Sequence, residues 1–409
     1  MVEQGLIEQI EQFLREQRPF YLELLERMVA INSFTANAAG VNRLGEETAV
    51  IFSDLGFTAE TIQSTTPHYG KHLVLSRSGS SGRKLGLIAH LDTVFPPEEE
   101  VANDFYFRIE GDRIYGPGSA DIKGGTVMIY MVLDGLRRFM PEFFEAMNWV
   151  ILLDASEEAE AEDFGRLCAE RLAGSLGGLI FESGEMNGNR FKLVRARKGL
   201  ASFQVRVQGK AAHAGNAHHR GANAVVQLAE IIQQLAALTD YERQLTVNVG
   251  WVAGGTVTNR VPHEAEARLE MRAFSVEAFE QTIETIMGFN GRSTLQSSEG
   301  YPCQVTVTLI EKTPPWQPNE ATDQLISYWQ QAAALLGQEI VPEERGGLSD
   351  ANHFWREVAC LDGLGPAGAN DHCSERSADG TKEQEYSVLS SYVPKAVLNI
   401  TAVLLLAQG

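Results

Sequence analysis

The sequence has little positive charge relative to negative charge. It contains 34 Lys and Arg against 54 Asp and Glu in 409 residues, a formal net charge of −20. Because phosphate backbones are bound by basic surfaces, this balance argues against nucleic acid as a general partner. It favours solubility and an attraction for cations, although most of the carboxylates must be solvated surface.

Cysteines are also few, and long apolar runs are missing. Cys168, Cys303, Cys360 and Cys373 are widely spaced without a CxxC pair, which favours reduced thiols in a cytoplasm. Cys373 follows His372, so a metal role is conceivable, but a small buried residue is the favoured interpretation. No run approaches the ~20 apolar residues of a membrane span, and the charged N-terminus does not resemble a signal peptide. We therefore expect a cytoplasmic protein without a membrane partner.

No repeat or low-complexity linker divides the chain, yet 409 residues are too many for one ordinary core. Residues 1–196 alternate strand-like and helical stretches, beginning with an amphipathic helix. The expected strands are 72–79, 85–92, 148–156 and 177–183, and the expected helices include 124–138 and 160–173. This alternation favours an α/β sheet with helices on its faces.

The stretch 197–312 has a different pattern: strand, helix, two alternating strands, helix and strand. Its helices are expected over 221–238 and 275–289, the second with Ser275 as N-cap. Such an order predicts a small α+β module. The α/β character returns after residue 313, with a helix near 321–336 and a packed final helix. We therefore predict a discontinuous catalytic domain, 1–196 and 313–409, interrupted by an inserted α+β domain, 197–312.

Several apolar strands and loops of the predicted catalytic domain deliver possible metal ligands where they end. These residues are His90, Asp92, Asp121, Glu157, Glu158, Glu182 and, in a distant glycine-rich loop, His372. In α/β sheets, chemistry collects beyond the carboxyl ends of the strands. Each residue alone has an ordinary explanation, such as a structural hydrogen bond or a solvated carboxylate. The set as a whole predicts a metal site.

Imidazole and carboxylate donors together favour Zn²⁺ or a related first-row ion over Ca²⁺, which prefers oxygen alone. Two histidines and three carboxylates exceed the three protein ligands of a typical catalytic zinc. They fit two ions about 3.5–4 Å apart that share a bridging carboxylate. We therefore expect two divalent ions per chain, Zn²⁺ first, with Co²⁺ or Mn²⁺ as alternatives.

The segments HLDTV, GPGSADIKGG, SEEAE, FES and NDHCSE, in this order and spacing, resemble the dinuclear zinc peptidases of the M20 family. The resemblance covers nearly the whole chain and is nearest to the glutamate carboxypeptidase branch. Within the insert, residues 209–215 and 254–272 resemble the family's dimerisation, or lid, domain. The resemblance implies a zinc-exopeptidase-like catalytic domain with a mixed sheet, helices on both of its faces, and a homodimer formed through the insert.

The resemblance also assigns roles to the residues named above. His90 and Glu182 would hold one metal, Glu158 and His372 the other, and Asp121 would bridge both. Asp92 would orient the ring of His90. Glu157 would be the general base that passes a proton from water to the leaving amine.

Three residues of the insert match substrate positions of the family. His213 would polarise the scissile carbonyl in the partner subunit's site, while Asn259 and Arg272 would bind the substrate carboxylate. The ordinary alternatives are an exposed surface histidine and a salt bridge on a strand. The chain also departs from the family pattern at three positions. Ser156 stands where the family commonly has an acidic residue, Ser183 where it often has proline, and Leu348 where the carboxypeptidases commonly have glycine.

The predicted function is therefore hydrolysis of an amide or peptide bond next to a free carboxylate, in a small peptide or N-acyl amino acid. An N-acyl-amino-acid deacylase of the same family is the alternative, because the metal core does not separate the two. A dinuclear phosphoesterase would need basic residues to clamp phosphate, and the sequence has no such cluster. A non-catalytic binding module is disfavoured because the candidate base, Glu157, is present.

Overall fold

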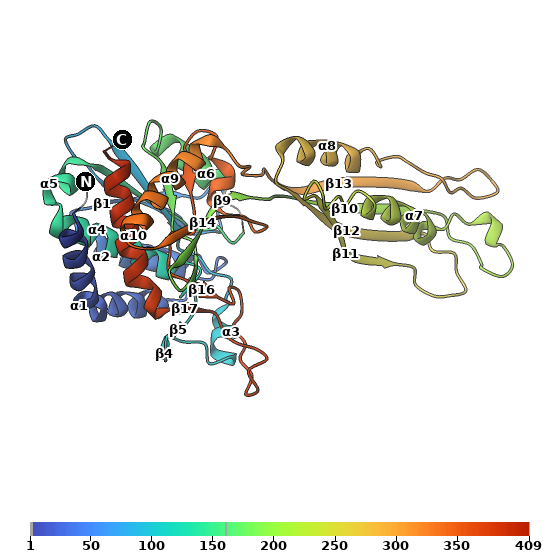
Figure 1. Ribbon diagram of the computed structural model, residues 1–409. Coiled ribbons are helices and arrows are strands. Elements are labelled where there is room, and N and C mark those ends of the chain that lie inside the picture. The colour runs from blue at the N-terminus through green and yellow to red at the C-terminus, as the bar shows by residue number, and fades with distance from the viewer. Residues whose placement is uncertain (1–2, 160–161, 409) are drawn as a thin grey trace. The chain divides into compact units, whose positions relative to one another are not determined.

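The computed structural model describes residues 3–159 and 162–408, and the chain divides into two compact units (Figure 1). Unit 1 comprises Met1–Arg195, Pro318–Glu344 and Ser349–Gly409, and unit 2 comprises Ala196–Gln317 and Arg345–Leu348. Unit 2 begins one residue before the predicted insert and ends five residues after it. It also takes in the loop 345–348, which the sequence analysis leaves in the catalytic domain.

The central sheet of unit 1 has six strands in the order β1-β2-β6-β3-β7-β15. These strands are β1 (Thr58–Gln63), β2 (Lys71–Arg77), β3 (Lys84–His90), β6 (Asn148–Asp154), β7 (Gly178–Ile180) and β15 (Cys360–Leu361). Strands β6, β3, β7 and β15 are parallel, whereas β1 and β2 pair antiparallel at one side. The sheet is therefore mixed, as predicted, and the carboxyl ends of β3, β6 and β7 share one edge.

Helices cover both faces of this sheet. On one face, Leu85 and Leu87 of β3 belong to a core that includes residues of α1, α2 and α4. On the other face, Gly86 packs against Leu172, which lies just beyond α6. The helices of unit 1 are α1 (Gln4–Val29), α2 (Ala38–Ser53), α3 (Pro97–Ala102), α4 (Lys123–Phe139), α5 (Pro141–Ala146), α6 (Glu162–Arg171), α9 (Glu320–Leu335) and α10 (Tyr392–Leu406). The expected helix over 160–173 starts on residues 160 and 161, which lie outside the described part of the chain.

The final helix is a core helix. The window Leu389–Leu406 is long and apolar enough to cross a membrane, with a mean hydropathy of 1.5, but 78% of it is buried inside the protein. Helix α10 packs against α1, α4 and α9. Its apolar composition is therefore explained by packing, as the sequence analysis expects.

Two smaller sheets complete unit 1, in the orders β14-β9-β8 and β16-β17-β5-β4. Their strands are β4 (Arg108–Glu110), β5 (Arg113–Tyr115), β8 (Glu185–Asn187), β9 (Arg190–Arg197), β14 (Glu339–Arg345), β16 (Gly368–Ala369) and β17 (Tyr386–Val388). The loop between β16 and β17 carries His372. Pairing of β17 with β5 therefore anchors this loop to the chain just before Asp121.

Unit 2 is a four-stranded antiparallel sheet in the order β11-β12-β10-β13. Its elements are β10 (Gly199–Gln208), α7 (Ala224–Ala236), β11 (Thr246–Gly254), β12 (Glu264–Ala273), α8 (Val276–Met287) and β13 (Gln304–Thr313). This order is the predicted one, and Ser275 caps α8 by accepting a hydrogen bond from the Ala278 N–H. Alternate strand residues such as Val205, Ala267 and Leu269 form one core with both helices, which leaves the other face solvated.

Candidate metal centre

Three parallel strands end beside one another and deliver the predicted ligands. His90 is the last residue of β3 and lies in register with Asp154, the last residue of β6. Glu157 and Glu158 follow β6 in a turn, and Glu182 follows β7 by two residues. Two further candidate ligands come from loops, because Asp121 precedes α4 and His372 lies between β16 and β17.

Asp121 lies between the two histidines. Its Oδ1 is 2.8 Å from His90 Nε2, and its Oδ2 is 3.4 Å from His372 Nε2. Glu182 Oε1 lies 3.6 Å from His90 Nε2, while Glu158 Oε2 lies 3.2 Å from His372 Nε2. Each oxygen of Asp121 therefore faces one histidine–glutamate pair, which is the arrangement that a bridging carboxylate needs.

Glycine shapes the loop that carries Asp121. Gly116 and Gly118 have φ values of 143° and 78°, which residues with a side chain rarely adopt. At Gly125 a Cβ would lie 2.0 Å from the carbonyl oxygen of Phe181, so helix α4 packs closely on the segment before Glu182. The glycines in GPGSADIKGG therefore bring Asp121 and Glu182 to the same place.

Asp92 supports the histidine and the glutamates together. Nδ1 of His90 donates to the main-chain oxygen of Asp92 at 3.0 Å, which leaves Nε2 as the atom available to a metal. The Asp92 carboxylate accepts the N–H of Glu157 at 3.1 Å and that of Glu158 at 3.2 Å. Asp92 therefore contacts the ring of His90 through its main-chain oxygen, and its carboxylate fixes the turn that carries both glutamates.

Glu385 is a supporting residue that the sequence analysis missed. It is fully buried, and its Oε1 accepts hydrogen bonds from the N–H groups of Ala120 and Asp121, at 3.0 and 3.3 Å. Its neighbours in the stretch TKEQE are polar, so the sequence favours an exposed loop. Only the tertiary pairing of β17 with β5 buries it beneath Asp121.

Burial and neighbouring charges shift the pKa values of the cluster. Burial raises the pKa of Glu157, and the nearby carboxylates Glu182 and Glu158 raise it further. The pKa of His372 rises to about 11 because the ring hydrogen bonds to Asp121 and Glu158. Burial raises the pKa of Asp121, but its hydrogen bonds to His372 and His90 outweigh burial and hold that pKa below its usual value.

These carboxylates crowd a site where only positive charge can balance them. Ligand atoms of His90, Asp121 and Glu158 all lie within 4.8 Å of one another. Imidazole and carboxylate donors of this kind suit Zn²⁺ and related divalent ions. The residues present therefore fit the metal pair that the sequence predicts.

The sequence analysis also considers Cys373 as a metal ligand because it follows His372. Its Sγ donates to the carbonyl oxygen of Glu375 at 3.6 Å.

His213 and Asn259 meet on exposed loops of unit 2. The backbone at His213 pairs with that at Arg260, and the Ala214 N–H donates to the main-chain oxygen of Asn259 at 3.0 Å. Nδ1 of His213 accepts the N–H groups of Gly215 and Asn216, both at 3.1 Å. In the neutral ring the proton therefore sits on Nε2, which is free to donate to a ligand.

Arg272 lies at the far end of β12 from this loop. Its Nε donates to Glu270 Oε1 at 3.1 Å, and its Nη1 donates to the carbonyl oxygen of Gly346 at 3.0 Å. A substrate carboxylate would therefore use the remaining N–H groups or compete with Glu270. The carbonyl oxygen of Leu348 accepts a hydrogen bond from Arg197 at 2.7 Å, so the loop 345–348 is held by two arginines of the same unit.

Comparison with known proteins identifies relatives of both units. Residues 195–291 match the family model of the M20 peptidase dimerisation domain. Carboxypeptidase G2 from Pseudomonas sp. (strain RS-16) is 27% identical over 340 residues, which cover 82% of this chain and 79% of the relative. Acetylornithine deacetylase from Erwinia tasmaniensis is 27% identical over 345 residues, covering 80% and 85%.

Solved structures share the fold over almost the full length. Aminopeptidase PepT from Bacillus cereus matches with a TM-score of 0.75 at 20% identity, covering 95% of this chain and 99% of the other. The Bacillus subtilis YXEP protein, described as a dinuclear metal-binding peptidase of the M20 family, matches with a TM-score of 0.61 at 15% identity, covering 98% and 99%. The predicted fold class is thereby confirmed: the chain is homologous to carboxypeptidase G2 and shares the fold of M20 peptidases, with a peptidase dimerisation domain inserted in the catalytic domain.

Proposed function

We propose that the chain is a metal-dependent exopeptidase that cleaves an amide bond next to a free carboxylate, as a glutamate carboxypeptidase does. The observation that carries this proposal is the position of Asp121, whose two oxygens each face one histidine–glutamate pair. His90 and Glu182 would hold one ion, and Glu158 and His372 the other. Zn²⁺ is the proposed ion, with Co²⁺ or Mn²⁺ as alternatives. When bound, such ions polarise a carbonyl group and lower the pKa of water.

Glu157 is the proposed general base. Its backbone is fixed by Asp92, and its carboxylate shares a buried site with Glu158, Glu182 and His90. In the reaction a Glu157 oxygen accepts a proton from the attacking water and then transfers it to the leaving nitrogen. The water oxygen forms the new bond to the carbonyl carbon, and the C–N bond breaks as that nitrogen is protonated.

Unit 2 supplies the proposed substrate contacts. Nε2–H of His213 would donate to the carbonyl oxygen as negative charge develops there. Asn259 and Arg272 would bind the free carboxylate of the substrate. The match of this unit to a dimerisation domain supports a homodimer in which His213 serves the partner subunit's site. All four cysteines are free, which supports the expected cytoplasmic location.

Deacylation of N-acyl amino acids is the second candidate. It is favoured by the acetylornithine deacetylase relative, which has the same 27% identity to this chain as carboxypeptidase G2 has. A release assay with the metal-loaded protein separates the two functions, using dipeptides, folyl-type glutamates and N-acyl amino acids. Fastest release from peptides or folyl glutamates supports the first proposal, fastest release from N-acyl amino acids supports the second, and no release from any of them contradicts both.

A further inference from the structure

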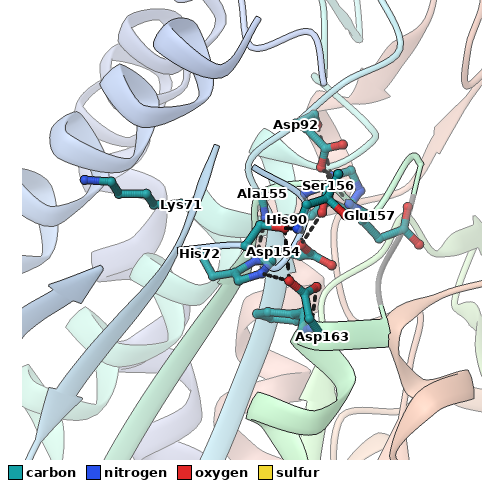
Figure 2. Close-up of polar contacts among 12 residues, drawn as sticks. Lys71, His72, His90, Asp92, Asp154, Ala155, Ser156, Glu157 and Asp163 are labelled. Atoms are coloured by element: carbon teal, nitrogen blue, oxygen red, sulfur yellow. Dashed lines mark hydrogen bonds and ion pairs between the residues drawn. The ribbon is translucent and has the colours of Figure 1, made fainter. Parts of the chain in front are cut away.

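The turn that carries Glu157 and Glu158 depends on the side chain of Asp92, which is buried beside it (Figure 2). Oδ1 of Asp92 accepts the Glu157 N–H and lies 3.4 Å from His90 Nδ1. Oδ2 accepts the Glu158 N–H. Each carboxylate oxygen therefore holds a different glutamate, so both hydrogen bonds depend on how the carboxylate is rotated about its Cβ–Cγ bond.

A threonine hydroxyl fixes this rotation. Oγ1 of Thr35 donates to Asp92 Oδ2 at 2.7 Å. It also lies 3.3 Å from the main-chain oxygen of Thr93, but a hydroxyl has one proton, and the shorter distance assigns that proton to Asp92. Within residues 3–159 and 162–408, the remaining donors to this carboxylate are the two backbone N–H groups and the His90 ring. Thr35 is therefore the one side chain that holds Oδ2.

The backbone that carries this hydroxyl is itself held in place. Thr35 lies in the segment 31–37, between α1 and α2, and this segment runs alongside the chain that follows β3. The Thr35 N–H donates to the main-chain oxygen of Thr93 at 3.0 Å, and the Thr93 N–H donates to that of Ser33 at 2.9 Å. The hydroxyl of Thr35 therefore approaches Asp92 from a hydrogen-bonded backbone and not from a free loop.

The same segment is also joined to the start of α4, close to Asp121. Lys123 begins α4 and is only 2% exposed, and its Nζ donates to the main-chain oxygen of Ile31 at 3.1 Å. The segment 31–37 thus contacts both the chain after β3 and the helix that follows Asp121. Thr35 is presented to Asp92 from a support shared by two sides of the candidate metal centre.

We propose that Thr35 is a positioning residue of the reaction, whose hydroxyl sets the rotation of the Asp92 carboxylate and thereby the positions of Glu157 and Glu158. The inference rests on the proposed function for the roles of the two glutamates. The polar contacts of Thr35 go to Asp92 and Thr93, so its effect on the reaction passes through Asp92. Without the hydroxyl, the carboxylate is free to rotate, and the turn loses the fixed geometry that a general base needs.

The test is the variant Thr35→Val in the full-length protein at saturating metal, assayed on the panel substrate that the wild type hydrolyses fastest. Valine keeps the shape of the side chain and removes the hydroxyl. We expect kcat to fall by about 10- to 100-fold with KM changed by less than about 3-fold, because a misplaced base loses rate and not binding. Thr35→Ser restores the hydroxyl and should stay within about 3-fold of the wild-type kcat.

Two further variants separate positioning from a general loss of stability. Thr401 is a matched control, since it is also buried and its hydroxyl donates to the main-chain oxygen of Val397 at 2.8 Å, within α10. Thr401→Val should leave kcat unchanged. The double variant Asp92→Asn/Thr35→Val should be no slower than Asp92→Asn alone, because the hydroxyl acts through that carboxylate.

Three kinetic outcomes overturn the proposal. The first is a kcat for Thr35→Val within about 2-fold of wild type. The second is a loss in Thr35→Ser or Thr401→Val as large as that in Thr35→Val. The third is a double variant in which the two losses multiply, which would show that the hydroxyl acts elsewhere.

Two measurements do not depend on turnover. Hydrogen exchange of the Glu157 and Glu158 amides should be faster in Thr35→Val than in wild type, and unchanged exchange overturns the proposal. If Thr35→Val does not fold, NMR of wild-type protein labelled with ¹³C-threonine decides. A Thr35 hydroxyl proton that exchanges slowly with water supports the link, and one that exchanges rapidly overturns it. If the wild type hydrolyses no panel substrate, the proposed function fails alone, and these two measurements still decide whether Thr35 holds the turn.

Discussion

The two units hold their candidate functional residues in opposite ways. In unit 1, His90, Asp92 and Glu182 are buried, and nearly every donor has a partner from another strand or loop. In unit 2, His213 and Asn259 lie on exposed loops. Nδ1 of His213 accepts two backbone N–H groups, and Nε2 lies on the other side of the ring. The contrast supports the proposal that a preorganised centre in unit 1 carries out the reaction, whereas the exposed loops of unit 2 offer donors to a substrate.

The largest expected effect lies in the buried unit. Glu157→Gln should lose about 10²- to 10⁴-fold in kcat while retaining metal, because it removes the base alone. Glu158→Gln should instead lower metal occupancy, because that carboxylate faces His372. Kinetics combined with metal analysis separates the two variants. If the two exchange their behaviour, the roles of the adjacent glutamates are reversed.

The next prediction concerns unit 2 and tests whether His213 serves the site of the partner subunit. His213→Ala should lose on the order of 10²-fold in kcat, the range for removal of one oxyanion donor. When His213→Ala and Glu157→Ala homodimers are mixed and re-equilibrated, half of the dimers become hybrids with one intact site. Activity should then recover to about a quarter of wild type. Recovery near zero, with subunit exchange verified by mass, contradicts a shared site.

Arg272 gives a smaller and more selective effect. Arg272→Ala should raise KM by about 10-fold for substrates with a free carboxylate and much less for their amides, because a charge-assisted hydrogen bond is lost. Arg268 is a matched control on the same strand, since it is exposed and pairs with Glu266. Arg268→Ala should leave both substrate types unchanged. An equal loss on both types in Arg272→Ala would show that Arg272 only supports Gly346 and the fold.

The sequence was sufficient for elements with strong periodicity and for ligands at strand ends. The strand around 85–92 predicted that His90 lies at the edge of a buried sheet, and the order of elements in the insert followed from alternating and helical patterns. Short strands such as β4 and β16 have two or three residues and no detectable period, so they were not predicted. Their positions nevertheless determine where His372 lies.

The supporting groups could not be predicted because their contacts are non-local. His72 is the second residue of an ordinary apolar strand, and only folding brings it to Asp154 and Asp163, over eighty residues away. Glu385 is buried although its neighbours in the sequence are polar. The proposed ligands could be named from local patterns, whereas the residues that orient them are visible only in the fold.

The central claim is that Asp121 joins two metal ions between two histidine–glutamate pairs. The most direct test is the metal content of the chelated and then reconstituted wild type, measured together with hydrolysis. We predict about two divalent ions per chain, loss of hydrolysis on chelation and its return on reloading. Full hydrolytic activity in a metal-free preparation would contradict the account.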